Sequence, residues 1–192
     1  EMIAYAKQKQ ITDTIETTTN GALLTKDKSK QLIEAGLDGI RISIEHVTDE
    51  GYKKITQNYS EYEQIRSNVE NLFHLKSQTD SNLKIHVKIV DANLSIDEKQ
   101  KFYDDFNSIS DTINIDSIMD WDGSDTYGRD FSLGQTLETS MNGVTRLNAE
   151  RSVCSSPFKS MAVNFDGQVS VCCVDWSFDT IIGDANKNSL LD

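Results

Sequence analysis

Apolar and polar residues change their period several times along the chain, and these changes predict alternating strands and helices. Gly39 to Glu45 (GIRISIE) and Leu83 to Val90 alternate apolar with polar side chains, which is the period of a strand. Between them lies a segment that Ser60 would cap, in which apolar residues recur every three or four positions. That spacing predicts a long helix with one apolar stripe, formed by Tyr62, Ile65, Val69, Leu72 and Phe73.

The same alternation continues on both sides of this segment. The β-branched run Thr14 to Thr18 predicts a strand, and Thr25 would cap a following helix that ends at Gly36. Further on, Ser95 to about Asn107 predicts a helix and Thr112 to Met119 a strand. Strands that alternate with crossing helices predict parallel βαβ units with right-handed crossovers, so we expect an α/β fold.

The pattern predicts three parts. Residues 1–123 form part of a (β/α) barrel, residues 124–153 are rich in Gly, Ser, Thr and Asn and form a linker or irregular loop, and residues 154–192 form a small module. The opening EMIAYAKQKQ has the pattern of the last turns of a helix without an N-cap. We therefore expect the chain to be a piece of a longer protein.

Charge and cysteine content narrow the function classes. The formal net charge is −12, which disfavours binding to nucleic acid or to an anionic membrane surface. No apolar run is long enough for a membrane span, and no secretion signal opens the chain. The chain has 3 cysteines, two of them adjacent, which is a poor disulfide framework and fits a reducing compartment. We expect a cytoplasmic protein.

The cysteines flank a predicted hairpin. Met161 to Phe165 and Gln168 to Val174 alternate in polarity around Asp166-Gly167, a turn sequence typical of hairpins. A hairpin can hold thiolates at fixed positions around a metal ion or an iron–sulfur cluster. Because neighbouring strand residues point to opposite faces, Cys172 and Cys173 would not both face one site without a bulge. The candidate metal ligands are therefore Cys154 and one or both of this pair.

Polar side chains also follow each predicted strand of the α/β part, where ligands bind in parallel sheets. They are Thr19, Asn20 and Gly21, then Ser43 and Glu45, then Asp91 and Asn93, then Asp120, Trp121 and Asp122. Such groups can bind a ribose, an amino-acid head group or a metal ion. Judged one at a time, the same residues are also ordinary turn formers. Composition alone leaves both interpretations open.

Three segments together resemble a known family. They are TTTNGALL from Thr17, RISIEH from Arg41, and Cys154 with twelve residues before Gly167 and four more before Cys172. This order is similar to radical S-adenosylmethionine (radical SAM) enzymes with a C-terminal SPASM domain. The resemblance implies a partial (β/α)6 barrel followed by the start of a SPASM hairpin module. It places Asn20, Gly21, Ser43 and Glu45 near S-adenosylmethionine, and Cys154, Cys172 and Cys173 at an auxiliary 4Fe–4S cluster.

The sequence also departs from that family. The Cys-x-x-x-Cys-x-x-Cys loop of the radical-generating cluster, the Gly-Gly-Glu turn and the later SPASM cysteines are absent from these residues. Tyr52 to Thr56 contains no arginine, so the family's cofactor contact there cannot be assigned. Structural zinc and cubane clusters usually take four ligands. We therefore expect this segment alone to hold no cluster and to be inactive.

The resemblance implies an oxidoreductase for the whole protein. It would cleave S-adenosylmethionine reductively to a 5′-deoxyadenosyl radical, take electrons from a flavodoxin or ferredoxin, and modify a peptide or a small molecule. One alternative is a non-catalytic metal- or cluster-binding interaction module. A barrel hydrolase using Asp91, Asp120 and Asp122 is disfavoured because no His-x-His pair ends a strand. An incomplete barrel would leave strand edges uncovered, which predicts self-association.

Overall fold

The computed structural model describes residues 1–56, 61–117, 156–172, 175, 178–187 and 189. Its contacts divide the chain into two compact units, Glu1–Ser117 and Ile118–Asp192, which are described separately below. The expected boundary at Gly123 and the expected linker over residues 124–153 lie outside the described residues.

The first unit is built on a four-stranded parallel sheet whose strands stand in chain order. The strands are β1 (Glu16–Thr19), β2 (Gly39–Ile44), β3 (Lys84–Asp91) and β4 (Thr112–Ser117). The helices are α1 (Met2–Gln8) before the sheet, α2 (Lys26–Glu34), α3 (Asp49–Thr56), α4 (Tyr62–Gln78) and α5 (Ile96–Phe106). The α/β prediction with parallel βαβ units is confirmed.

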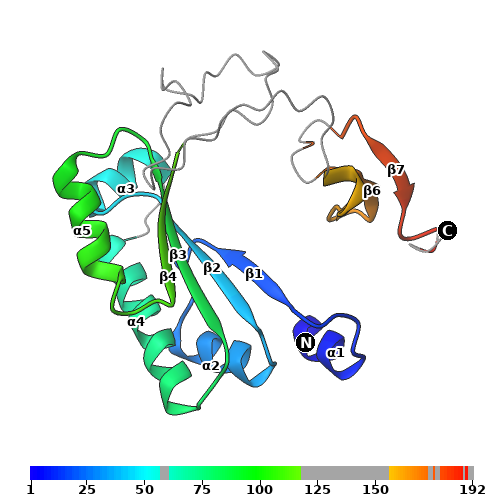
Figure 1. Ribbon diagram of the computed structural model, residues 1–192, viewed down its shortest axis with the longest axis horizontal. Helices are drawn as coiled ribbons and strands as arrows, with labels where there is room; N and C mark the ends of the chain where they lie inside the picture. Colours follow the sequence, from blue (N-terminus) through cyan, green and yellow to red (C-terminus); the bar gives the residue numbers. More distant parts are fainter. Residues whose placement is uncertain (57–60, 118–155, 173–174, 176–177, 188, 190–192) are drawn as a thin grey trace. The chain divides into compact units, whose positions relative to one another are not determined.

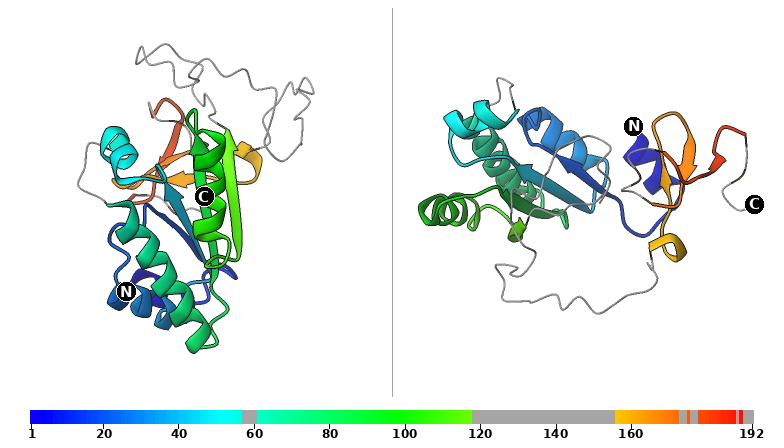
Figure 2. Two further views of the ribbon diagram at one scale, coloured as in Figure 1. Left: turned by 90° about the vertical axis from the view of Figure 1, so that its left-hand side faces the viewer. Right: turned by 90° about the horizontal axis from the view of Figure 1, so that it is seen from above.

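The crossing helices α2, α4 and α5 all lie on one face of the sheet (Figures 1 and 2). When strands follow one another in chain order and all crossovers have the same hand, every helix returns over the same side of the sheet. A doubly wound sheet would instead distribute its helices over both faces. The arrangement is that of part of a barrel wall.

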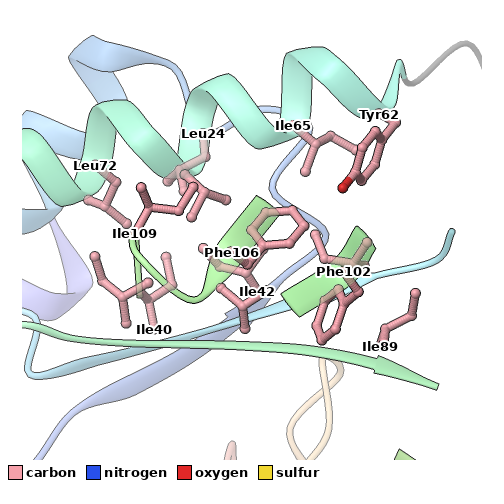
Figure 3. Close-up of a cluster of buried hydrophobic side chains, with 14 of the residues drawn as sticks. Leu24, Ile40, Ile42, Tyr62, Ile65, Leu72, Ile89, Phe102, Phe106 and Ile109 are labelled. Carbon is pink, nitrogen blue, oxygen red and sulfur yellow. The ribbon is translucent and has the colours of Figure 1, made fainter. Parts of the chain in front are cut away.

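The hydrophobic core fills the space between the sheet and these helices (Figure 3). Ile40 and Ile42 of β2 face Ile65 and Leu72 of α4, and all four side chains are almost fully buried. Phe102 and Phe106 of α5 complete this layer, with ring centroids 5.5 Å apart. The predicted apolar stripe of α4 is thus the surface that covers the sheet.

Local capping signals account for two of the helix starts. The Thr25 side chain accepts a hydrogen bond from the Lys28 N–H at 3.3 Å at the start of α2. Ser95 and Glu98 form a reciprocal capping box at the start of α5. Gly36 follows α2 with φ of +80°, as a C-terminal stop requires.

Within the described residues, no helix has the length and apolarity that a membrane crossing needs.

The connection between β2 and α4 differs from the prediction. The N-cap of α4 is Glu61, not Ser60, which lies outside the described residues. Asp49 takes the capping role from a distance, because its Oδ1 accepts a hydrogen bond from the Tyr62 N–H at 2.6 Å.

The sequence pattern did not predict α3. This helix is only 8 residues long and contains Gly51, at a position where an added Cβ would collide with the His46 ring. Acidic residues in its first turn and lysines in its last turn complement the helix dipole. Gly51 and Tyr52 are its buried residues, so tertiary packing also stabilises this short helix.

The second unit contains the predicted hairpin. It has a 3₁₀ turn, η2 (Ser156–Phe158), and an antiparallel sheet of β5 (Ala162–Val163), β6 (Gln168–Ser170) and β7 (Ile181–Asp184). The hairpin joins β5 to β6 through a turn closed by the Gly167 N–H and the Asn164 carbonyl at 3.0 Å. β6 ends at Ser170, so only the first part of the alternating segment Gln168 to Val174 is strand, and Val174 lies outside the described residues.

Candidate functional site

The sheet face opposite the helices carries polar and charged side chains. Burial alternates along β2 and β3, so every second residue faces away from the core. Register partners arrange these residues in rows across the strands: Thr18, Arg41, His86 and Thr112 form one row, Ser43, Lys88 and Asn114 the next, and Val90 and Asp116 the third. Parallel sheets are usually buried on both faces, so this charged face is a candidate ligand surface.

Pairs between neighbouring strands hold these side chains in place. Arg41 contacts Glu16 at 2.8 Å and Lys88 contacts Asp116 at 3.1 Å. The Nδ1 atom of His86 lies 2.7 Å from the Thr112 hydroxyl oxygen. The polar face is therefore an ordered array along the strands.

Ser43 and Glu45 lie at the carboxyl end of β2 and are both half-buried. Among the described residues neither side chain has a hydrogen-bond partner. Burial raises the pKa of Glu45 above its ordinary value, and the nearby positive charge of Lys88 partly opposes this rise. A hydroxyl beside an unpaired carboxylate can bind ligand hydroxyls or an ammonium group.

The backbone at Glu45 is held by Tyr52 of α3. The Glu45 N–H donates to the Tyr52 hydroxyl oxygen at 3.0 Å, and the Tyr52 side chain is almost fully buried. Burial raises the pKa of Tyr52 to about 12, so this hydroxyl stays neutral. The unpredicted helix α3 thus positions a predicted site residue.

Asn20 and Gly21 form the turn that leaves β1 beside β2. The Asn20 side-chain oxygen accepts from the Ala22 N–H, and the Thr19 hydroxyl accepts from the Gly21 N–H, both at 3.1 Å. Gly21 is buried with φ of +77°, and an added Cβ would lie 3.1 Å from Ile65 Cγ2. These interactions are turn chemistry, and the assignment of Asn20 and Gly21 as cofactor-binding residues stays a prediction.

Asn68 of α4 is a site-supporting residue that the sequence interpretation missed. Its amide donates to the carbonyls of Gly21 at 3.0 Å and Ala22 at 3.3 Å, and its oxygen accepts from Gln64 at 3.0 Å. With 4% of its surface exposed, it ties α4 to the turn after β1. The sequence feature that could have revealed Asn68 is its position directly before Val69, which belongs to the apolar stripe of α4.

The polar residues after β3 have structural partners. Asp91 accepts from the Leu94 N–H at 3.0 Å and pairs with Lys99 at 2.6 Å, which joins the end of β3 to α5. Asn93 takes a left-handed backbone conformation with φ of +62°. The candidates after β4, Asp120, Trp121 and Asp122, lie outside the described residues.

Cys172 is half-buried and lies just beyond β6. Its carbonyl accepts from the Ser170 hydroxyl at 3.2 Å and from the Asp175 N–H at 3.4 Å, so the chain bends at the cysteine. Cys172 therefore lies beyond the strand, and the alternation expected of strand residues does not determine which way it faces. Cys154 and Cys173 lie outside the described residues, and the described residues alone contain no group of three potential metal ligands.

The loop after Cys172 is organised by Asp175. Its carboxylate accepts from the Thr180 hydroxyl at 2.6 Å, the Thr180 N–H at 2.8 Å and the Asp179 N–H at 3.1 Å. These bonds, with the Thr180 hydroxyl first, hold the pKa of Asp175 below its ordinary value. The loop carries Cys172 at one end and leads into β7 at the other.

Comparisons with known proteins agree with these features. Residues 154–192 match the SPASM family, described as an iron–sulfur cluster-binding domain. A segment of 56 residues is 48% identical to a protein of Methanococcus maripaludis named probable GTP 3′,8-cyclase. It spans 29% of this chain and 18% of that protein's length. Together they confirm the resemblance to radical SAM proteins with a SPASM extension.

Proposed function

We propose that this chain supplies part of the S-adenosylmethionine-binding barrel wall and the first part of the SPASM module of a radical SAM enzyme. The observation that carries the proposal is the pair of half-buried polar groups of Ser43 and Glu45 at the carboxyl end of a strand, neither of which has a side-chain hydrogen-bond partner within the part of the chain that the structure describes. Parallel α/β sheets bind their ligands at this end.

The polar groups at the end of β2 suit the proposed cofactor. Glu45 would accept hydrogen bonds from ribose hydroxyls or from the ammonium group, and Ser43 would add one donor and one acceptor. A cationic ligand would also offset the cost of burying the Glu45 carboxylate, which its raised pKa reflects. Reductive cleavage of S-adenosylmethionine supplies a 5′-deoxyadenosyl radical for hydrogen abstraction.

Cys172 would be one ligand of an auxiliary 4Fe–4S cluster, with Cys154 and Cys173 as further candidates. The SPASM match over residues 154–192 supports this assignment. The enzyme's substrate would be a peptide or a small molecule, and a flavodoxin or ferredoxin would supply its electrons. The open edges of the sheet make self-association of this segment a further part of the proposal.

The test is calorimetric binding of S-adenosylmethionine to the 192-residue chain and its variants. We expect Ser43→Ala and Glu45→Gln each to weaken binding about tenfold, the effect of one lost hydrogen bond to a charged group. Ser77→Ala and Glu63→Gln are matched controls, because both residues are exposed and lie on α4, which packs against the opposite face of the sheet. Neither control should change the affinity.

Equal affinities in all four variants would contradict the assignment of Ser43 and Glu45. A chain that binds no S-adenosylmethionine, yet takes up iron or zinc through its cysteines, would favour the non-catalytic interaction module instead.

A further inference from the structure

The polar face of the sheet contains a hollow at the amino-terminal half of the strands. Its volume is about 430 Å³, and Arg41, His86, Lys88 and Thr112 contribute to its walls. Gly39 also lines it and is the register partner of Glu16 on β1 and of Lys84 on β3, which places it one row before the row of Arg41. A Cβ added at Gly39 would lie 3.0 Å from Glu16 Cγ, so the glycine lets the Glu16 side chain lie across this level of the face.

The lining is cationic in an acidic protein. Among the residues that line the hollow, Arg41, Lys84 and Lys88 outnumber the carboxylates Glu16 and Asp116. Lys84 also lies 3.9 Å from Asp111, which is outside the lining, and the whole chain carries a formal charge of −12. An excess of positive charge in a concave surface favours anionic ligands.

The Arg41 guanidinium has N–H donors that its ion pair with Glu16 does not use. Arg41 and Glu16 are 57% and 48% exposed, so their ion pair contributes little to stability and a ligand can compete for it. The recorded contact uses one terminal nitrogen of Arg41, and a guanidinium carries five N–H donors in a planar fork that fits an oxyanion.

His86 stands next to Arg41 in the same row and can report on such a ligand. Its Nδ1 contacts Thr112, and its Nε2 has no partner among the described residues. Burial, followed by the positive charge of Arg41, lowers the pKa of His86, so the ring is neutral at pH 7. Lys88 lowers this pKa further, while Asp116 and Glu16 oppose the change.

We propose that this hollow binds an oxyanion group, carboxylate or phosphate, of the enzyme's substrate, with Arg41 as the principal contact. This inference rests on the proposed function and specifies its substrate class. Arg41 precedes Ser43 by two residues and Glu45 by four, which is about 7 and 13 Å at about 3.3 Å per strand residue. A substrate anchored at Arg41 would extend along the face toward the cofactor residues.

The test is titration of the 192-residue chain with inorganic phosphate and, separately, with acetate, followed by the ring nitrogen NMR signals of His86 at pH 7. A bound anion favours the imidazolium form, so the pKa of His86 should rise and its signals should move saturably. Whichever anion saturates at the lower concentration identifies the group that the hollow prefers.

Three variants locate the binding. Arg41→Gln should weaken binding about tenfold, because it removes a charged hydrogen-bond donor. Glu16→Gln should strengthen binding, since it removes the competing carboxylate. Arg66→Gln removes the same charge from α4 and should leave the affinity unchanged.

Absence of saturation with both anions would overturn the proposal, as would equal affinity in the Arg41 and Arg66 variants. The measurement contains no S-adenosylmethionine, so its failure is distinct from a failure of the cofactor assignment.

Discussion

At the residue scale, Gly167 is required for two independent reasons. Its φ is +91°, a backbone conformation that favours glycine. An added Cβ would also collide with the Asn186 amide nitrogen, which donates to the Asp166 carbonyl at 2.8 Å. The glycine between the two cysteines of the SPASM-like spacing therefore lets Asn186 close over the hairpin turn.

Gly167→Ala should destabilise the second unit by about 2 kcal/mol, which combines the left-handed backbone cost with the lost Asn186 bond. Hydrogen exchange at the Asn164 and Ala185 amides measures this, because both bond across the turn. Gly183→Ala is the control, since the nearest atom to its added Cβ, on Val169, is 4.0 Å away. Equal exchange rates in both variants would contradict this explanation.

At the element scale, Asp111 joins α4 to the sheet just before β4 begins. Its carboxylate contacts the Lys76 ammonium at 2.6 Å and accepts from the Ile85 N–H at 2.7 Å. Burial acts to raise the pKa of Asp111, but the two hydrogen bonds together with the positive charges of Lys76 and Lys84 outweigh burial and hold the pKa below its ordinary value. The ionised form is therefore the one that the fold stabilises.

Asp111→Asn should lower the free energy of unfolding at pH 7 by about 1 kcal/mol, a value reduced by partial solvation. A lowered pKa gives stability that is present above the ordinary value and is lost as the pH falls through the folded value. The difference in free energy of unfolding between Asp111→Asn and the parent chain should therefore shrink as the pH falls below 3.8, the ordinary pKa of an aspartate. Urea unfolding across pH 3 to 7 tests this, with exposed Asp104→Asn as control; a pH-independent difference would contradict it.

The elements that the sequence predicted well are those that local chemistry determines. Strands with one buried face show a clear period, and the caps at Thr25 and Ser95 act within three residues. The missed features depend on contacts between distant segments. Asp49 caps α4 across thirteen residues, and Asn68 reaches a turn 47 residues away.

In the candidate site too, features set by local sequence were predicted and features set by contacts between distant segments were not. Alternation along β2 identified Ser43 and Glu45 as neighbours at a strand end. The Lys88–Asp116 pair and the row of Arg41 and His86 depend on the pairing register of the strands, which a single sequence does not specify. The hollow could therefore be recognised only after the strands were aligned.

At the scale of the whole molecule, apolar burial is unevenly distributed. The core cluster lies entirely within the first unit, between Leu24 and Ile115. In the described part of the second unit, Val169 alone is a buried hydrophobic residue. Small domains with little core usually depend on metals or disulfides for stability.

Residues 1–117 expressed alone should therefore unfold cooperatively, at the midpoint of the main transition of the full chain. Residues 118–192 alone, without metal, should show no cooperative transition. Circular dichroism during heating measures both. An unfolded 1–117 fragment, or a cooperative apo 118–192 fragment, would contradict this division of stability.

The chain-order arrangement of β1 to β4 also has a consequence for synthesis on the ribosome. Each of β2, β3 and β4 pairs with the strand made immediately before it. Every new strand therefore finds its earlier partner already available, and the loops that must close stay short for a parallel sheet. The wall can grow one βα unit at a time in the direction of translation, without waiting for a distant strand.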